Sequence, residues 1–128
     1  PGVYSLLLYD AEKIYPVYME ADVVVLASPM YYWGISGQLK CAFDRLFAVA
    51  ELTPNYTNPK KECVLLMAAE GETEENFAPV KAFYEGLTKN LGWKSLGIVY
   101  AGGNMETGAI SKNPGQLEQA EKLGRTIY

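Results

Sequence analysis

The chain has 128 residues, 49% of them hydrophobic, and a formal net charge of −4 at pH 7. This length predicts one compact domain, and the acidic balance argues against nucleic acid or an anionic membrane surface as the main partner. Because the sequence contains no histidine, histidine-dependent nucleophiles and histidine-ligated metals are excluded. Cys41 and Cys63 have no metal-binding spacing, so we expect no metal site and two reduced thiols in a cytoplasmic protein. No stretch is long and apolar enough to span a bilayer.

The first half of the chain alternates apolar runs with helical patterns. Residues 3–9 form a candidate strand, and a short helix is expected before residue 22. The β-branched run at 22–27 is typical of a strand covered on both faces. Apolar residues at helical spacing predict a helix over 35–50, with Ser36 as its cap.

The second half continues the same alternation. Two further strands are expected at 62–69 and 95–101, separated by a helix over 77–91 that Asn76 caps. Asn113 and Pro114 predict the start of a last helix, with Gln116 placed to complete a box-like cap. Apolar strands, each followed by an amphipathic helix, predict an α/β fold with a parallel sheet between two helical layers.

Three loops that follow strands are the candidate site. Ligands of such sheets bind beyond the carboxyl ends of the strands, where residues 28–34, 70–76 and 102–108 should meet. The first loop carries Tyr31, Tyr32 and Trp33 in a row, and such rings suit stacking on a planar heterocycle. The alternative is that these rings cover the end of the sheet or a partner subunit.

The other two loops give weaker signals. Gly102 and Gly103 follow a strand, and glycines in that position are usually simple turn residues. The four glutamates within residues 70–75 fit a solvated acidic turn near a helix N-terminus better than a metal site. Since no paired acid–base site is visible, any chemistry would have to come from a cofactor.

A family resemblance rests on residues 21–46, ADVVVLASPMYYWGISGQLKCAFDRL. This segment resembles the flavodoxin-like NAD(P)H-dependent FMN reductases, including the iron–sulfur flavoprotein branch and the quinone reductase relatives. The likeness continues more loosely through 62–71 and 96–103. It implies one three-layer, doubly wound flavodoxin-like α/β domain over 1–128. It also implies an enzyme that passes electrons from NAD(P)H through bound FMN to a quinone, a flavin or another small acceptor.

The resemblance also implies a set of flavin contacts and a homodimer. No residue is expected to be catalytic, because the flavin performs the chemistry. The ring-side contacts would come from the first loop, and the secondary contacts from the other two. In full, they are Ser28, Pro29, Met30, Tyr31, Tyr32, Trp33 and Gly34, followed by Glu70, Gly71, Gly102 and Gly103.

This sequence departs from the family at its start. The family opens with a strand and a Gly-Ser-rich loop that holds the FMN phosphate, and no such loop is present here. We therefore expect a sheet without the family's first strand–helix unit, with three core strands and 3–9 as a candidate fourth. Strand 22–27 would then have an unpaired edge that residues 3–9, other residues or another subunit must cover. Two alternative functions follow: a flavin-binding electron carrier without its own substrate, and a flavin-free dimerisation or interaction module.

Overall fold

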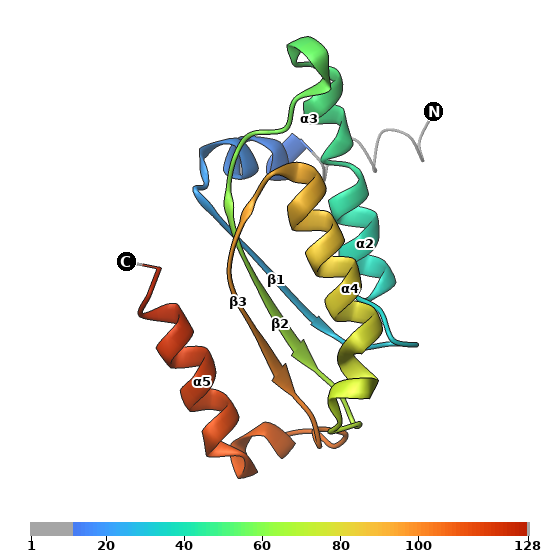
Figure 1. Cartoon of the computed structure of the whole chain (residues 1–128), viewed down its shortest axis with the longest axis vertical. Coiled ribbons are helices and arrows are strands. Elements are labelled where there is room, and N and C mark those ends of the chain that lie inside the picture. Colours follow the sequence, from blue (N-terminus) through green and yellow to red (C-terminus); the bar gives the residue numbers. More distant parts are fainter. Residues whose placement is uncertain (1–11, 128) are drawn as a thin grey trace.

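The computed structural model describes residues 12–127, and the candidate strand at 3–9 lies outside this range. Strands and helices alternate along the described chain (Figure 1). After a helix over 12–20, the elements are β1 (Val23–Pro29), α2 (Gly37–Asp44), α3 (Phe47–Glu51), the 3₁₀ turn η1 (Pro54–Tyr56), β2 (Glu62–Ala68), α4 (Glu74–Leu91), β3 (Lys94–Ala101), the 3₁₀ turn η2 (Ala109–Lys112) and α5 (Pro114–Gly124).

The three strands form one parallel sheet in the order β1-β2-β3. Val25 lies opposite Val64, and Leu66 lies opposite Val99. In Figure 1 all three arrowheads point to the same lower edge, which we call the rim. Helices α2 and α4 lie on one side of the sheet and α5 on the other, which gives three layers. The predicted α/β class and parallel sheet are confirmed.

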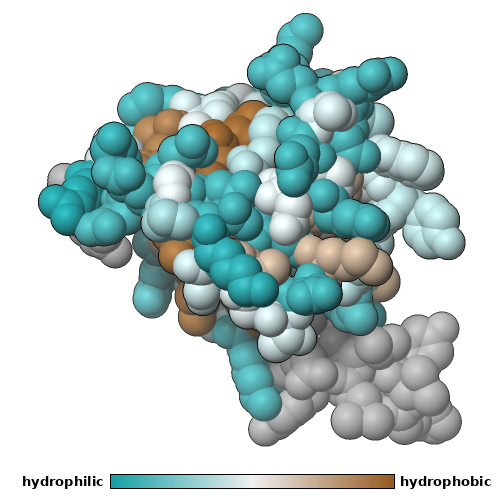
Figure 2. Space-filling model, turned by 90° about the horizontal axis from the view of Figure 1, so that it is seen from below, coloured by the Kyte–Doolittle hydropathy of each residue, from teal (hydrophilic) through white to brown (hydrophobic). Residues whose placement is uncertain are grey.

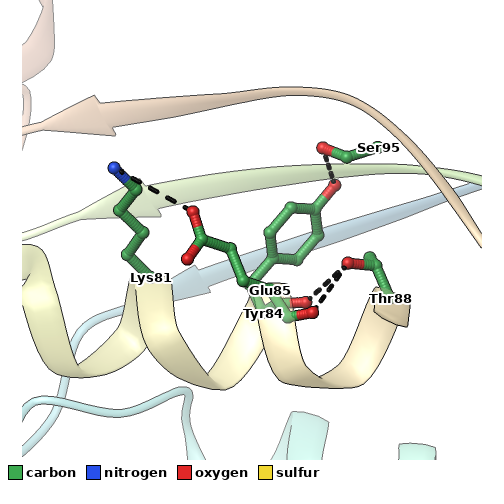
Figure 3. A network of polar contacts seen from close by, with 5 residues as sticks. All are labelled: Lys81, Tyr84, Glu85, Thr88 and Ser95. Atoms are coloured by element: carbon green, nitrogen blue, oxygen red, sulfur yellow. Dashed lines mark hydrogen bonds and ion pairs between the residues drawn. The ribbon is translucent and has the colours of Figure 1, made fainter. Parts of the chain in front are cut away.

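A buried tyrosine joins α4 to the sheet. Tyr84 is fully buried, and its hydroxyl donates to the carbonyl oxygen of Cys63 at 2.7 Å. The same hydroxyl lies 3.0 Å from Ser95 Oγ (Figure 3), so one side chain contacts both β2 and β3. Because a buried hydroxyl must find partners, these contacts fix the position of α4. Burial also raises the pKa of Tyr84 to about 12.

The helix predicted over 35–50 is divided into α2 and α3. Ser36 caps α2 as expected, since its Oγ accepts from Leu39 N at 3.2 Å. At this break the amide of Leu46 donates to the Phe43 carbonyl, and the amide of Val49, in the first turn of α3, donates to the Leu46 carbonyl, both at 3.0 Å. Such i→i+3 bonds tighten the chain into a 3₁₀ turn, which ends one helix before the next begins.

Helix α4 begins at Glu74, three residues before the predicted start. The prediction that Asn76 caps this helix is wrong, because the N-cap is Thr73, whose Oγ1 accepts from Asn76 N at 3.2 Å. Glu74 and Glu75 then occupy the first turn, where the helix dipole favours negative charge. Gly92 ends the helix in a left-handed conformation with φ 64°.

One face of the sheet is covered unevenly. Helix α5 packs on β3, where an added Cβ at Gly97 would lie 2.9 Å from Leu123 Cδ1. Over β1, on the same face, Val25 is 48% exposed, whereas its neighbour Leu26 is buried on the opposite face. The expectation that strand 22–27 is covered on both faces is therefore wrong for β1 at Val25. Among residues 12–127, no helix combines the length and apolar character of a membrane span.

Candidate functional site

The loop after β1 folds into a two-residue hairpin, here called the aromatic hairpin (residues 31–34). The amides and carbonyls of Tyr31 and Gly34 exchange two hydrogen bonds of 3.1 Å. Between them Tyr32 has φ 47° and Trp33 has φ 61°. Positive φ at both central positions is the mark of a type I′ turn, which normally selects Asn and Gly.

Large aromatic residues are costly in this turn. A left-handed conformation costs a residue with a Cβ roughly 1–2 kcal/mol. Their rings do not recover this cost by packing into the interior, since Tyr32 is 95% exposed and Trp33 is 56% exposed. The two rings contact each other edge to face, with centroids 6.4 Å apart. Strained residues of this kind cluster at active sites and ligand clamps, which makes the aromatic hairpin a candidate binding element.

A hollow of about 320 Å³ lies between the aromatic hairpin and the loop after β2, and we call it the rim pocket. Ligand sites begin at roughly 300 Å³, so the rim pocket has the size of a small site. Figure 2 views this end of the molecule from below, where hydrophilic residues cover most of the surface. The lining residues are Met30, Tyr31, Tyr32, Trp33, Ala69, Glu70, Gly71 and Asn76.

Six of the eleven predicted contact residues line the rim pocket. Of the other five, Ser28, Pro29 and Gly34 support the aromatic hairpin. Ser28 is buried, and its Oγ accepts from Ser36 N at 2.8 Å and donates to the Pro29 carbonyl at 2.7 Å. These bonds tie the end of β1 to the start of α2. Gly34 closes the hairpin through its bonds with Tyr31.

Gly102 and Gly103 stand behind the rim pocket and support its wall. The amide of Gly103 donates to the carbonyl of Glu70 at 2.9 Å, which extends the pairing of β2 and β3 past the strands. An added Cβ at Gly102 would lie 2.6 Å from the carbonyl oxygen of Gly71. Glycine at 102 therefore lets the two loops pack backbone against backbone.

The first turn of α5 is also tied to this edge. Gln116 Nε2 donates to the Gly102 carbonyl, and Gln116 Oε1 accepts from Asn104 Nδ2, both at 2.8 Å. Asn113 makes no side-chain cap, and its Nδ2 instead donates to Asn104 Oδ1 at 3.3 Å. The predicted box-like cap is thus replaced by a side-chain network that holds the loop after β3.

Sequence reasoning missed two lining residues, Ala69 and Asn76. The sequence predicts helix capping by Asn76, yet its Nδ2 is buried and has no hydrogen-bond partner among the described residues. The spacing of Thr73 and Asn76 carried the missed signal, because a Thr three residues before a polar residue is typical of an N-cap. Reading Thr73 as the cap would have left Asn76 without that role.

The electrostatics of the rim pocket are acidic. Glu70 lines the pocket, and none of the eight lining residues is basic. The nearby glutamates are exposed, with Glu74 and Glu75 in the first turn of α4. Within residues 12–127, no group of three or more side chains could hold a metal ion. The pocket therefore suits an uncharged planar group better than a phosphate.

Two curated proteins are similar to this chain, one over a short segment and one over most of its length. An FMN-dependent NADH:quinone oxidoreductase from Stenotrophomonas maltophilia is 44% identical over 48 residues, which cover 38% of this chain and 24% of that protein. An iron–sulfur flavoprotein from Archaeoglobus fulgidus is 28% identical over 120 residues, which cover 92% of this chain and 50% of that protein. The chain thus spans half or less of the length of these curated relatives.

Solved structures share the fold. The Trp repressor binding protein from Bacillus subtilis superposes with a TM-score of 0.74 at 22% identity, covering 89% of this chain and 70% of that one. An FMN-dependent NADH-azoreductase from Bacillus anthracis, solved in complex with FMN, gives a TM-score of 0.64 at 14% identity, covering 97% and 65%. The flavodoxin-like fold expected from residues 21–46 is confirmed. Residues 9–104, well over half of the sequence, match the model of the NADPH-dependent FMN reductase family, and the chain belongs to that family.

Proposed function

We propose that this chain binds FMN at the rim pocket and passes electrons from NAD(P)H to a small acceptor such as a quinone. The observation that carries the proposal is the aromatic hairpin, which holds exposed rings beside a hollow at the carboxyl ends of the strands. Membership of the FMN reductase family supports the cofactor. A quinone acceptor has support only from the partial match to the Stenotrophomonas protein.

The pocket residues fit the ring system of FMN. Tyr31 and Trp33 offer flat apolar walls for stacking, and the backbone at Gly71 offers polar groups close to the hollow. The buried Nδ2 of Asn76 lacks a partner, as expected of a site that a polar ligand completes. Because no lining residue is basic, the pocket would take the uncharged ring, with the phosphate outside it.

The protein's own part in the reaction is binding and shielding. When bound, FMN supplies hydride acceptance and onward electron transfer. The exposed rings of Tyr32 and Trp33 would cover the ring system and keep water from it. The bonds from Ser28 and Gly103 would each support one wall, and the Met30 amide, which donates to the Ala68 carbonyl at 2.8 Å, joins the two walls, so the ring would be oriented by the sheet.

We further propose that the protein works in the cytoplasm as a homodimer. Cys41 and Cys63 are both free thiols, as in a reducing compartment. Strand β1 is the outer strand of the described sheet, and Val25 on it is exposed. A second subunit would cover this apolar surface.

The test is a titration of the full chain with FMN, in which the absorption bands of the flavin are measured. Binding is expected to shift the flavin bands, and NADH or NADPH added without oxygen is expected to bleach them. Tyr31→Ala and Trp33→Ala should each weaken FMN binding several-fold, because each removes a stacking surface. No band shift in the wild type, or unchanged affinity in both variants, would contradict the proposal.

The same titration tests the two alternatives. A flavin-free interaction module is favoured by the near-complete exposure of Tyr32 and by the lack of basic lining residues. That function predicts no flavin binding and burial of the aromatic hairpin in a complex. An electron carrier predicts FMN binding without reduction by a pyridine nucleotide.

A further inference from the structure

Asn76 is the lining residue of the rim pocket whose hydrogen bonds are incomplete. Its side-chain Nδ2 is buried, and it has no partner among residues 12–127. An unpaired buried donor is unfavourable, and native structures rarely keep one without a reason. The Tyr100 hydroxyl is the other buried side-chain atom without a partner in the described part of the chain, and it does not line the rim pocket.

Asn76 lies in the first turn of α4, where its side chain could have paired with the N-terminus of the helix. Three residues after the N-cap Thr73, a Glu or Gln side chain can reach back to the cap residue's amide and complete a capping box, whereas this position holds the shorter Asn76. Asn76 supplies its own backbone amide to Thr73 Oγ1 at 3.2 Å, yet its side chain does not return the bond. The amide group turns instead toward the loop after β2.

Gly71 makes room for this orientation. An added Cβ at Gly71 would lie 2.3 Å from Asn76 Nδ2 and 2.6 Å from Asn76 Cγ. The carboxamide is therefore pressed against the backbone of a residue that itself lines the rim pocket. Because the terminal torsion of asparagine is soft, the amide can turn into the hollow while α4 stays in place.

We infer that Asn76 is a binding residue of the rim pocket, whose side-chain N–H donates to an acceptor atom on the polar edge of a bound planar heterocycle. The inference rests on the proposed function, under which that acceptor is a carbonyl oxygen or ring nitrogen of the flavin. Its neighbours strengthen it, because the carboxylates of Glu70, Glu74 and Glu75 can only accept hydrogen bonds when ionised. A carboxamide supplies a side-chain donor that these carboxylates cannot.

The experiment compares the full wild-type chain with three variants, each titrated with FMN and also melted without flavin. Asn76→Ala should lower FMN affinity about tenfold, as for the loss of one hydrogen bond to the ligand. Asn76→Asp keeps the size but replaces the donor by an acceptor, so a larger loss is expected. Asn90→Ala is the matched control, since Asn90 lies at the other end of α4 and bonds to the Gly86 carbonyl at 2.7 Å.

Two further readouts separate a binding role from a structural one. Without flavin, Asn76→Ala should melt at the wild-type temperature or above it, because an unpaired donor is removed. Riboflavin, which has the same ring and no phosphate, should show the same fold-loss as FMN.

The outcomes distinguish this inference from the proposed function. Wild-type affinity in Asn76→Ala or Asn76→Asp, with FMN bound by the wild type, would overturn the inference and leave the proposed function standing. A fold-loss for FMN that is absent for riboflavin would also overturn it, because the contact would then be to the phosphate. Failure of the wild type to bind FMN would contradict the proposed function and this inference together.

Discussion

At the scale of single residues, the aromatic hairpin lowers the stability of the fold but exposes rings that can bind a ligand. Tyr32 and Trp33 take positive φ angles that asparagine and glycine tolerate better, yet they expose their rings. The sequence predicted the position of these rings at the rim, because they follow an apolar strand directly. It did not predict the type I′ turn, since two aromatic residues give no signal for that geometry.

Two variants that both remove the ring of Trp33 can separate the cost of its backbone strain from its contribution to binding. Trp33→Gly should be more stable than Trp33→Ala by about 1 kcal/mol, because glycine adopts a positive φ without a Cβ penalty. Both variants should lose FMN affinity to a similar extent, since the stacking surface is absent from each. Urea unfolding and FMN titration provide the two measurements. Equal stability of the glycine and alanine variants would show that the turn is not strained.

At the scale of elements, the strands were predicted more closely than the helix ends. A buried strand is a continuous apolar run, and β1, β2 and β3 match the predicted runs to within two residues at each end. Helix starts depend on which of several polar residues takes the cap. Thr73 and Asn76 are both good cap residues, and the spacing that places Thr73 three residues before a polar residue is the signal that favours Thr73. The break between α2 and α3 was missed because the apolar stripe runs through it.

The start of α4 gives a prediction that separates these two residues. Thr73→Ala should lower the free energy of unfolding by about 1 kcal/mol, because the bond to the Asn76 amide is lost. Thr73→Ser keeps the hydroxyl and should restore most of the difference. Asn76→Ala should cost nothing by the same urea measurement. The reverse ranking, with a stable Thr73→Ala and a destabilised Asn76→Ala, would return the capping role to Asn76.

At the scale of the whole molecule, the sheet is more open than the sequence pattern suggests. Apolar residues in a strand show that both faces can be buried, but not what covers each face. Helix α5 covers β3, and a groove of about 400 Å³ lies beside it over all three strands, lined by residues that include Ala27, Leu66 and Leu117. The rim could be predicted because parallel strands must end together, whereas the extent of cover depends on where each helix packs.

The bare face of β1 supplies the last prediction, which tests the proposed homodimer. If a second subunit packs on this face, Val25→Lys should dissociate the dimer, because a charge would be buried at the contact. Analytical ultracentrifugation over a range of micromolar concentrations measures the change. Leu52→Lys is the control, since Leu52 is 88% exposed at the end of α3 and its substitution should leave the dimer intact. A wild type that stays monomeric throughout would contradict the dimer, and a Val25→Lys variant that remains dimeric would move the interface to another surface.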